Sequence, residues 1–108
     1  MTEEATICSH FQQAAELVAK RWNPQIVRAL LAGVSRFSDL RAAIPQISDA
    51  LLSERLKELE ASGIVTRTVT PQTPVRIDYG LTERGRDLSS VMDELAAWAE
   101  RWAEPANS

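Results

Sequence analysis

The sequence predicts one mainly α-helical domain that carries a single small β-hairpin. Three observations indicate it: a leucine-patterned helix over residues 48–62, two β-branched stretches directly after it, and a long apolar helical stripe near the end. The chain has 108 residues, of which 44% are hydrophobic, and this suits one modest core better than two. A capped amphipathic helix followed at once by a hairpin is how a winged helix-turn-helix carries its recognition helix and wing.

The first part of the chain predicts two helices after a loose start. Residues 1–7 are polar, and we expect them to be flexible. The first helix is expected over residues 11–20, where apolar residues recur at helical spacing. The second is expected to begin at Asn23, a good cap, followed by Pro24 at the first helical position, and to end at Gly33.

Two further helices are expected before the hairpin. The third covers residues 38–44, with Ser38 as its cap, and ends before Pro45 because a residue preceding proline avoids α geometry. The fourth has Ser48 as its cap and is ended by Gly63. Its inward positions are Leu52, Leu56 and Leu59.

The remaining residues predict the hairpin and one last helix. The stretches 64–70 and 75–81 are rich in β-branched residues, and the two prolines of residues 71–74 mark the loop between them. Thr82 is expected to cap one long helix that runs to Trp102. The predicted order is therefore α-α-α-α-β-β-α, with a single domain over residues 1–108.

The charge distribution is compatible with a nucleic-acid partner for the middle of the chain only. The formal net charge is −3, although phosphate contacts are made by Lys and Arg. Residues 88–108 hold one basic and four acidic side chains, whereas residues 35–87 hold eight of each. A neutral central region with clustered arginines can still bind a duplex, so charge neither proves nor excludes DNA.

Several other classes of protein are disfavoured. No apolar run approaches the ~18 residues of a membrane span, and residues 1–10 lack the order of a signal peptide, so we expect a cytoplasmic protein without a membrane partner. Cys8, the single cysteine, has only His10 nearby, which makes no metal-ligand cluster. The sequence also lacks a glycine-rich phosphate loop and an evident catalytic constellation, so we expect no cofactor and no enzymatic activity.

The order of these motifs resembles the HxlR-type winged-helix regulators, relatives in fold of the MarR group. The resemblance covers roughly residues 8–102 and rests on Cys8, Lys20-Arg21-Trp22, residues 26–30, residues 36–40, Ile47-Ser48 with Leu52, residues 55–60, Gly63, the hairpin prolines, Tyr79 and residues 81–85. It implies a homodimer that binds an imperfect palindrome and usually represses transcription. Asp49 and Ala50 depart from it, because members often carry basic or amide side chains there, and Glu54 is more acidic than the resemblance leads us to expect.

The outward face of the fourth helix is the predicted base-reading surface. A major groove accepts a helix, and its base edges can be read by Ser, Lys or a carboxylate. Three arginines, Arg36, Arg67 and Arg76, are expected to contact the backbone or a minor groove. The full predicted DNA-binding set is Arg36, Ser38, Ser48, Asp49, Ala50, Ser53, Glu54, Arg55, Lys57, Arg67 and Arg76. The alternative is that these residues form an ordinary solvated surface.

Residues 8–22 and 83–103 are expected to be dimerisation helices on either side of a helix-turn-helix and wing at residues 24–81. The predicted interface is Phe11, Leu17, Val18, Leu88, Val91, Met92, Leu95, Trp98 and Trp102. Such a dimer would place two recognition helices about 34 Å apart, one turn of DNA. The alternative is that the tryptophans close the core of a monomer.

Cys8 is the one candidate for chemistry. It precedes the first helix, where a thiol can become reactive, although a cysteine is more often a small buried hydrophobe. The resemblance adds that some members respond to oxidants or electrophiles through a cysteine near the N-terminus, by an intersubunit disulfide or an adduct. A small-molecule effector is thus a candidate partner beside double-stranded DNA. A winged-helix module that binds a protein or a ligand, with weak or no DNA binding, is the alternative function.

Overall fold

The computed structural model describes residues 5–104, and the expected flexible residues 1–4 lie outside this range. Residues 5–7 are exposed and have no regular secondary structure. The elements in chain order are α1 (Ser9–Val18), α2 (Asn23–Leu31), α3 (Phe37–Ala43), α4 (Asp49–Ala61), β1 (Val65–Thr70), β2 (Arg76–Leu81), α5 (Glu83–Arg86) and α6 (Ser89–Arg101). The mainly helical class with one hairpin is confirmed.

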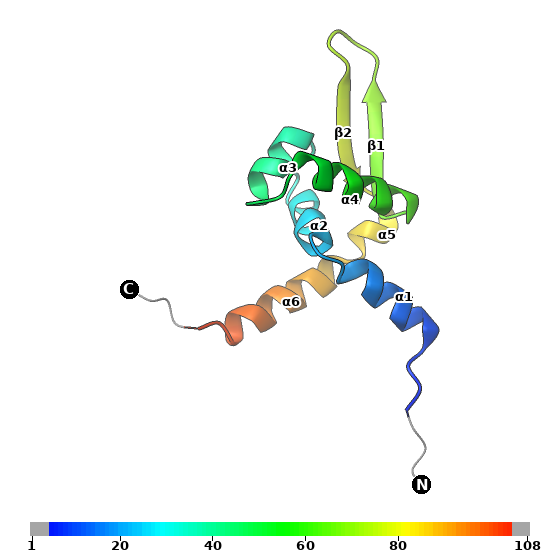
Figure 1. The fold of residues 1–108 in the computed structure, drawn as a ribbon, viewed down its shortest axis with the longest axis vertical. Coiled ribbons are helices and arrows are strands. Elements are labelled where there is room, and N and C mark those ends of the chain that lie inside the picture. Colours follow the sequence, from blue (N-terminus) through cyan, green and yellow to red (C-terminus); the bar gives the residue numbers. More distant parts are fainter. Residues whose placement is uncertain (1–4, 105–108) are drawn as a thin grey trace.

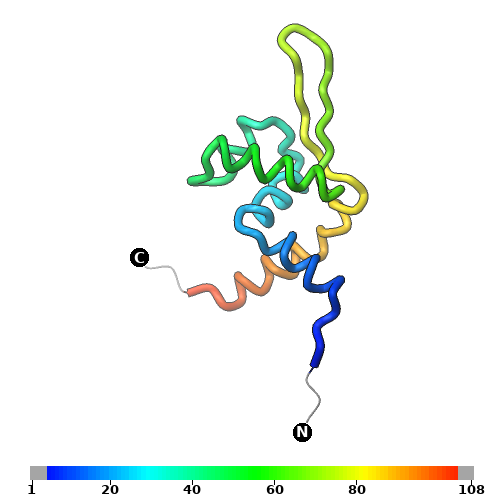
Figure 2. Tube along the Cα trace, turned by 45° about the vertical axis from the view of Figure 1, so that its right-hand side comes forward, coloured from blue at the N-terminus to red at the C-terminus, as the bar shows by residue number. Residues whose placement is uncertain are grey.

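The molecule has a helical centre with a projecting hairpin (Figure 1). Helices α2, α3 and α4 gather in the middle, and the two strands extend away from them in both views (Figures 1 and 2). Helices α1 and α6 lie at the opposite end and diverge from there (Figure 1). The hairpin and the two terminal helices are thus available for contacts with different partners.

The hydrophobic core forms where α4 covers α2, α3 and the base of the hairpin. The leucines expected to face inward on α4 are confirmed, since Leu52, Leu56 and Leu59 are buried. The rest of the core is Trp22, Ile26, Val27, Leu30, Leu40, Ile44, Ile47, Ile64, Val65 and Met92. Burying one face of α4 in this way turns its other face to solvent.

Both ends of α4 follow the local sequence signals. The Ser48 hydroxyl oxygen accepts a hydrogen bond from the backbone N–H of Leu51 at 3.1 Å, which satisfies one of the free donors of the first turn. At the other end Gly63 adopts φ +76°, the left-handed conformation that glycine takes without steric cost. The predicted cap and stop of this helix are confirmed.

The predicted caps of α2 and α3 are wrong. Asn23 is buried, and its amide nitrogen donates to the backbone oxygen of Leu17 at 2.8 Å, so it serves a free carbonyl of α1 and does not cap α2. Trp22, with φ 80°, takes the position before α2. Helix α3 starts one residue earlier than expected, after Arg36, and Ser38 lies within its first turn as an exposed residue without a capping hydrogen bond.

The single long helix expected after the hairpin is also wrong, because α5 and α6 are separate helices. Thr82 caps α5 as expected, with its hydroxyl oxygen 3.0 Å from the backbone nitrogen of Gly85. A Cβ at Gly85 would overlap the backbone oxygen of Ile64, so α5 is packed tightly on the base of the hairpin. The N–H of Leu88 then bonds to the Gly85 carbonyl at 3.1 Å, and this tighter three-residue turn redirects the chain before α6.

The hairpin is a regular antiparallel pair, with its register running from Val65 opposite Leu81 to Thr70 opposite Arg76. The backbone N–H of Tyr79 donates to the carbonyl of Ser35 at 2.8 Å, which fixes β2 against the loop between α2 and α3. Between residues 5 and 104, no helix combines the length and apolar character needed to cross a membrane.

Candidate nucleic-acid interface

The outward face of α4 carries the side chains expected to meet DNA. Asp49, Ala50, Glu54 and Lys57 are exposed, and Ser53 is half-buried. Lys57 makes no ion pair with any residue between 5 and 104, so its ammonium group is available to a base or a phosphate. This face has the composition of a surface that reads base edges through hydroxyl, ammonium and carboxylate groups.

Both carboxylates on this face are paired with arginines. Asp49 forms an ion pair with Arg41 of α3, and Glu54 lies 3.4 Å from the guanidinium of Arg55. The neighbouring positive charges reduce the repulsion that unpaired carboxylates would exert on a phosphate backbone. The negative charges of Asp49 and Glu54, which are unfavourable for DNA binding, are therefore partly offset by the charges of Arg41 and Arg55.

Arg55 is held within the fold. Its Nε donates to the backbone oxygen of Arg21 at 3.0 Å, and a second nitrogen lies 3.5 Å from Glu58. Only 13% of its side chain is exposed. Arg55 is therefore mostly buried at the junction of α1 and α2, and only one terminal nitrogen reaches Glu54 on the outward face of α4.

A cluster of charged side chains joins the start of α3 to the hairpin. Asp78 lies 3.3 Å from Nε of Arg36 and accepts from Nε of Arg76 at 2.8 Å. The hydroxyl of Ser35 lies 3.4 Å from the same carboxylate and can donate to it. The hydrogen bond from Arg76 lowers the pKa of Asp78, and the charge of Arg36 lowers it further.

The structure brings Arg36 and Arg76 together but places Arg67 elsewhere. Residues opposite each other in a sheet share a face, and successive residues alternate between faces. Arg76 and Asp78 therefore lie on one face of the hairpin, while Arg67, which pairs with Tyr79, lies on the other. Sequence reasoning named the arginines and missed Asp78, although its spacing of two residues from Arg76 in a strand was a visible signal of a shared face.

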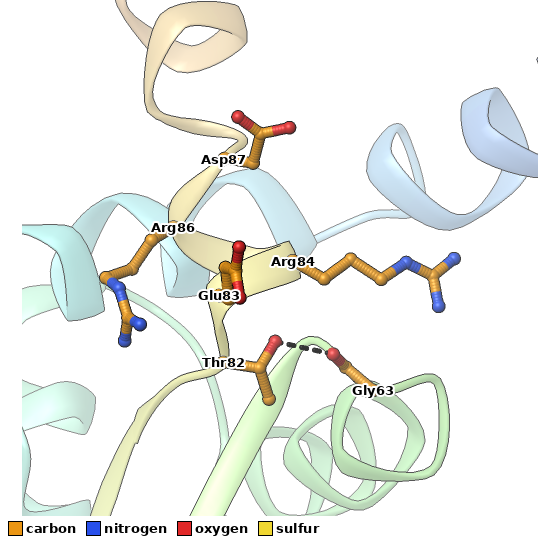
Figure 3. Close-up of a pocket in the computed structure, with 6 residues that line it drawn as sticks. All are labelled: Gly63, Thr82, Glu83, Arg84, Arg86 and Asp87. Carbon is orange, nitrogen blue, oxygen red and sulfur yellow. Dashed lines mark hydrogen bonds between the residues drawn. The ribbon is translucent and has the colours of Figure 1, made fainter.

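A polar pocket at the hairpin base was not expected from the sequence. Figure 3 shows Arg84 and Arg86 pointing to opposite sides of α5, beside Thr82 and Gly63. Arg84 donates to the Ser62 carbonyl and Arg86 to the Leu81 carbonyl, both at 2.8 Å. The two guanidinium groups thus satisfy backbone oxygens where α4, the hairpin and α5 meet. We interpret the residues around this pocket as structural, because their hydrogen bonds hold these elements together.

Cys8 is exposed directly before α1 and is a free thiol. The backbone N–H groups of Phe11 and His10 lower the pKa of Cys8, because donors at a helix N-terminus stabilise the thiolate. Within the described range, no group of three His, Cys, Asp or Glu side chains could hold a metal ion. Cys8 therefore has the exposure and the electrostatic setting of a reactive thiol.

The terminal helices leave a large apolar surface uncovered. Trp98 and Trp102 are 57% and 70% exposed, which rules out the alternative that they close the core of the monomer. Phe11, Val91 and Leu95 are also exposed, together with Ile7, which sequence reasoning did not single out.

The other members of the predicted interface are more buried. Leu17, Val18 and Leu88 are partly buried against the core, and Met92 lies inside it, because its side chain faces the helical centre of the same protomer. Met92 therefore has no exposed surface to offer a partner.

The matching family model and several similar proteins agree on one family of regulators. Residues 17–107 match the model of the HxlR-like helix-turn-helix family. The chain is 46% identical over 103 residues to the uncharacterized HTH-type transcriptional regulator YvaP of Bacillus subtilis strain 168, with 95% of each chain covered. It is 45% identical over 103 residues to the HTH-type transcriptional regulator YodB of the same strain, with 95% of this chain and 92% of YodB covered.

Solved structures share the fold as well. The reduced form of YodB superposes with a TM-score of 0.80 at 44% identity, covering 94% of this chain and 100% of that one. YodB has also been solved in diamide-treated and quinone-bound forms. The redox regulator HypR in its oxidised form gives a TM-score of 0.83 at 30% identity, covering 89% of this chain and 99% of HypR. The chain belongs to the HxlR-like helix-turn-helix family and has the winged-helix fold of these transcriptional regulators.

Proposed function

We propose that this protein is a cytoplasmic, non-enzymatic transcriptional repressor that binds a palindromic operator as a homodimer. Helix α4 reads the major groove and the hairpin acts as the wing. The observation that carries the proposal is the outward face of α4, where Ser53 and Lys57 point away from the buried leucines. Membership of a family of helix-turn-helix transcriptional regulators supports the same function.

The homodimer is supported by the exposed apolar residues of α1 and α6. Along α6 and its C-cap, Val91, Leu95, Trp98 and Trp102 recur at helical spacing, and an exposed apolar stripe of this kind commonly marks a contact with a partner. The acidic C-terminal segment belongs to this end of the molecule, away from the hairpin (Figure 1). A two-fold dimer through these helices presents two copies of α4 to successive turns of one duplex.

DNA binding is tested with a duplex enriched by the wild-type protein from a random-sequence library. Lys57→Ala should weaken binding by about 1–3 kcal/mol, the usual cost of losing one base contact. The matched control is Arg101→Ala, which removes one exposed positive charge from the end of α6 and should leave affinity nearly unchanged. Equal affinities for the wild type and Lys57→Ala would count against α4 as the reading helix.

The alternative of a protein-binding or ligand-binding module draws its support from the acidic residues Asp49 and Glu54 on α4. The enrichment of a duplex from the random-sequence library also distinguishes this alternative from DNA binding. If the oxidised and reduced proteins both recover no preferred duplex at micromolar concentration, the interaction module is favoured and DNA binding is rejected.

We further propose that Cys8 makes DNA binding sensitive to oxidants and electrophiles. The support is its exposure, its lowered pKa and the existence of redox and quinone forms among similar regulators. With diamide, two thiols from two protomers would form one disulfide while the two electrons and two protons pass to the oxidant. With a quinone, the thiolate sulfur would add to a ring carbon to form a C–S bond, and the ring oxygen would take up a proton.

The sensing proposal has a clean control because Cys8 is the single cysteine of the chain. Treatment with diamide or a quinone should change the DNA affinity of the wild type and leave that of Cys8→Ser unaltered. If both proteins respond equally, or neither responds, Cys8 is not the sensor.

A further inference from the structure

We propose that Arg36 and Arg76 form one composite site for a single backbone phosphate of DNA, and that Asp78 is the positioning residue that joins them. The inference rests on the proposed DNA-binding function and adds to it a defined ligand group and a role for an acidic side chain. A carboxylate would otherwise be expected only to repel DNA.

The carboxylate of Asp78 is held in place by the loop that contains Ser35. Strand β2 is tied to the preceding loop by the hydrogen bond from the Tyr79 N–H to the Ser35 carbonyl, and the Ser35 hydroxyl lies 3.4 Å from the carboxylate. The Asp78 side chain is 27% exposed, whereas the side chains of Arg36 and Arg76 are 44% and 46% exposed. The side chain of Asp78 is thus the least exposed of the three, and the two arginine side chains are more accessible to a ligand.

The contacts leave donors free for a phosphate. Asp78 lies within 3.3 Å of Nε of Arg36 and accepts Nε of Arg76 at 2.8 Å, while one terminal nitrogen of Arg76 is at 3.5 Å. Each guanidinium has five N–H donors, so terminal N–H groups of both arginines remain available. A phosphate oxygen accepts such donors in pairs, as a carboxylate does.

The charges also favour a shared site. Two guanidinium groups brought together repel each other, and one carboxylate between them offsets this repulsion while leaving a net charge of one positive unit. That excess matches one singly charged backbone phosphate. Arg67 lies on the opposite face of the hairpin and cannot join this site.

The site predicts an effect opposite to that of simple electrostatics. Asp78→Asn makes the protein less acidic, yet it should weaken DNA binding by about tenfold, near the lower end of the loss expected when charge-assisted hydrogen bonds are removed. The matched control is Glu104→Gln, which removes one exposed negative charge just beyond the end of α6 and should leave binding unchanged or slightly stronger.

The salt dependence distinguishes one shared phosphate from two separate ones. Each neutralised phosphate contributes a slope of about 0.9 in log K against log salt for duplex DNA. Arg36→Ala, Arg76→Ala and the double variant should each lower the slope by about 0.9 per protomer, and the double variant should not reach about 1.8. In the Asp78→Asn background the losses caused by the two arginine substitutions should become additive, because the arginines then act independently.

The measurements use the duplex enriched by the wild-type protein, and circular dichroism reports whether each variant is folded. A folded Asp78→Asn that binds as tightly as the wild type, or additive effects of the two arginine substitutions in the wild type, would overturn the composite site. If Asp78→Asn does not fold, Asp78→Glu replaces it, because it keeps the charge and displaces the carboxylate. Its tight binding would overturn the inference equally. A wild type that enriches no duplex would instead reject the proposed function itself.

Discussion

The guanidinium of Arg55 illustrates at the residue scale how position on a helix decides what a charge does. Arg55 lies two residues before Lys57 in sequence, but the helical rotation directs it to the backbone of Arg21, while Lys57 faces solvent. One arginine thus satisfies a carbonyl at the junction of α1 and α2, and the neighbouring lysine is free for a ligand.

Replacing Arg55 should therefore affect stability more than DNA binding. Arg55→Ala leaves the Arg21 carbonyl and Glu58 without this donor, so the free energy of unfolding should fall by about 1–3 kcal/mol, measured by urea denaturation. The slope of DNA affinity against salt should not change. Arg67→Ala, which removes an exposed arginine of β1, is the comparison and should leave stability within about 0.5 kcal/mol of the wild type.

The lowered pKa of Asp78 makes a second residue-scale prediction, with a definite sign. A carboxyl whose pKa is lower in the folded protein stabilises the fold above its ordinary pKa, and this contribution is lost as the pH falls through the lowered value. The urea midpoints of the wild type and Asp78→Asn should differ at neutral pH and converge below the ordinary carboxyl pKa of 3.8. A difference that grows toward acid pH would contradict the ion cluster.

At the scale of elements, the sequence predicted best what is decided locally. The cap, leucine spacing and glycine stop of α4 all lie between Ser48 and Gly63, and all three are confirmed. The use of Asn23 depends instead on its contact with Leu17 in the preceding helix, and the tight packing of α5 ahead of α6 depends on Ile64, 21 residues before Gly85. Periodicity alone cannot show such contacts, because Thr82 caps a helix equally well whether it is short or long.

The Asp78 cluster shows the same limit for the candidate site. The alternation of Arg76 and Asp78 along β2 is visible in the sequence, but their meeting with Arg36 depends on the docking of β2 against the loop at Ser35. The arginines could therefore be named as candidates, and their grouping could not.

The junction of α5 with the hairpin base can be tested at Gly85. A Cβ there would overlap the Ile64 carbonyl, so Gly85→Ala should lower the free energy of unfolding by about 1–3 kcal/mol, the cost of overpacking a tight contact. Gly80→Ala is the matched control, because its Cβ would approach only the side-chain oxygen of Thr66 at 3.1 Å, which can rotate away. Similar losses for both variants would show that the close approach at Ile64 is not decisive.

At the scale of the whole molecule, α1 connects the two ends at which function is proposed. Cys8 precedes the start of α1. Lys20, just beyond the other end of α1, pairs with Glu58 of α4 at 2.9 Å, and the Arg21 carbonyl accepts from Arg55. If Cys8 is the sensor that we propose, a change at the thiol that moves α1 is expected to reach α4 through these two contacts.

The dimer proposed at the opposite end from the hairpin can be tested with two residues of equal exposure. Leu95 on α6 and Val69 on β1 are both 47% exposed, but only Leu95 belongs to the apolar surface of the terminal helices. A buried unpaired carboxylate is costly, so Leu95→Glu should convert the protein to a monomer at micromolar concentration in sedimentation velocity.

Val69→Glu should remain a dimer, because its carboxylate stays in water on the hairpin. The Leu95→Glu monomer should also lose most of its affinity for a palindromic duplex while keeping a folded α4, since one protomer engages only one half-site and the second no longer adds to binding. If Leu95→Glu sediments as the wild type does, the terminal helices are not the interface. If it is monomeric and binds the palindrome unchanged, the two copies of α4 do not act together on one duplex.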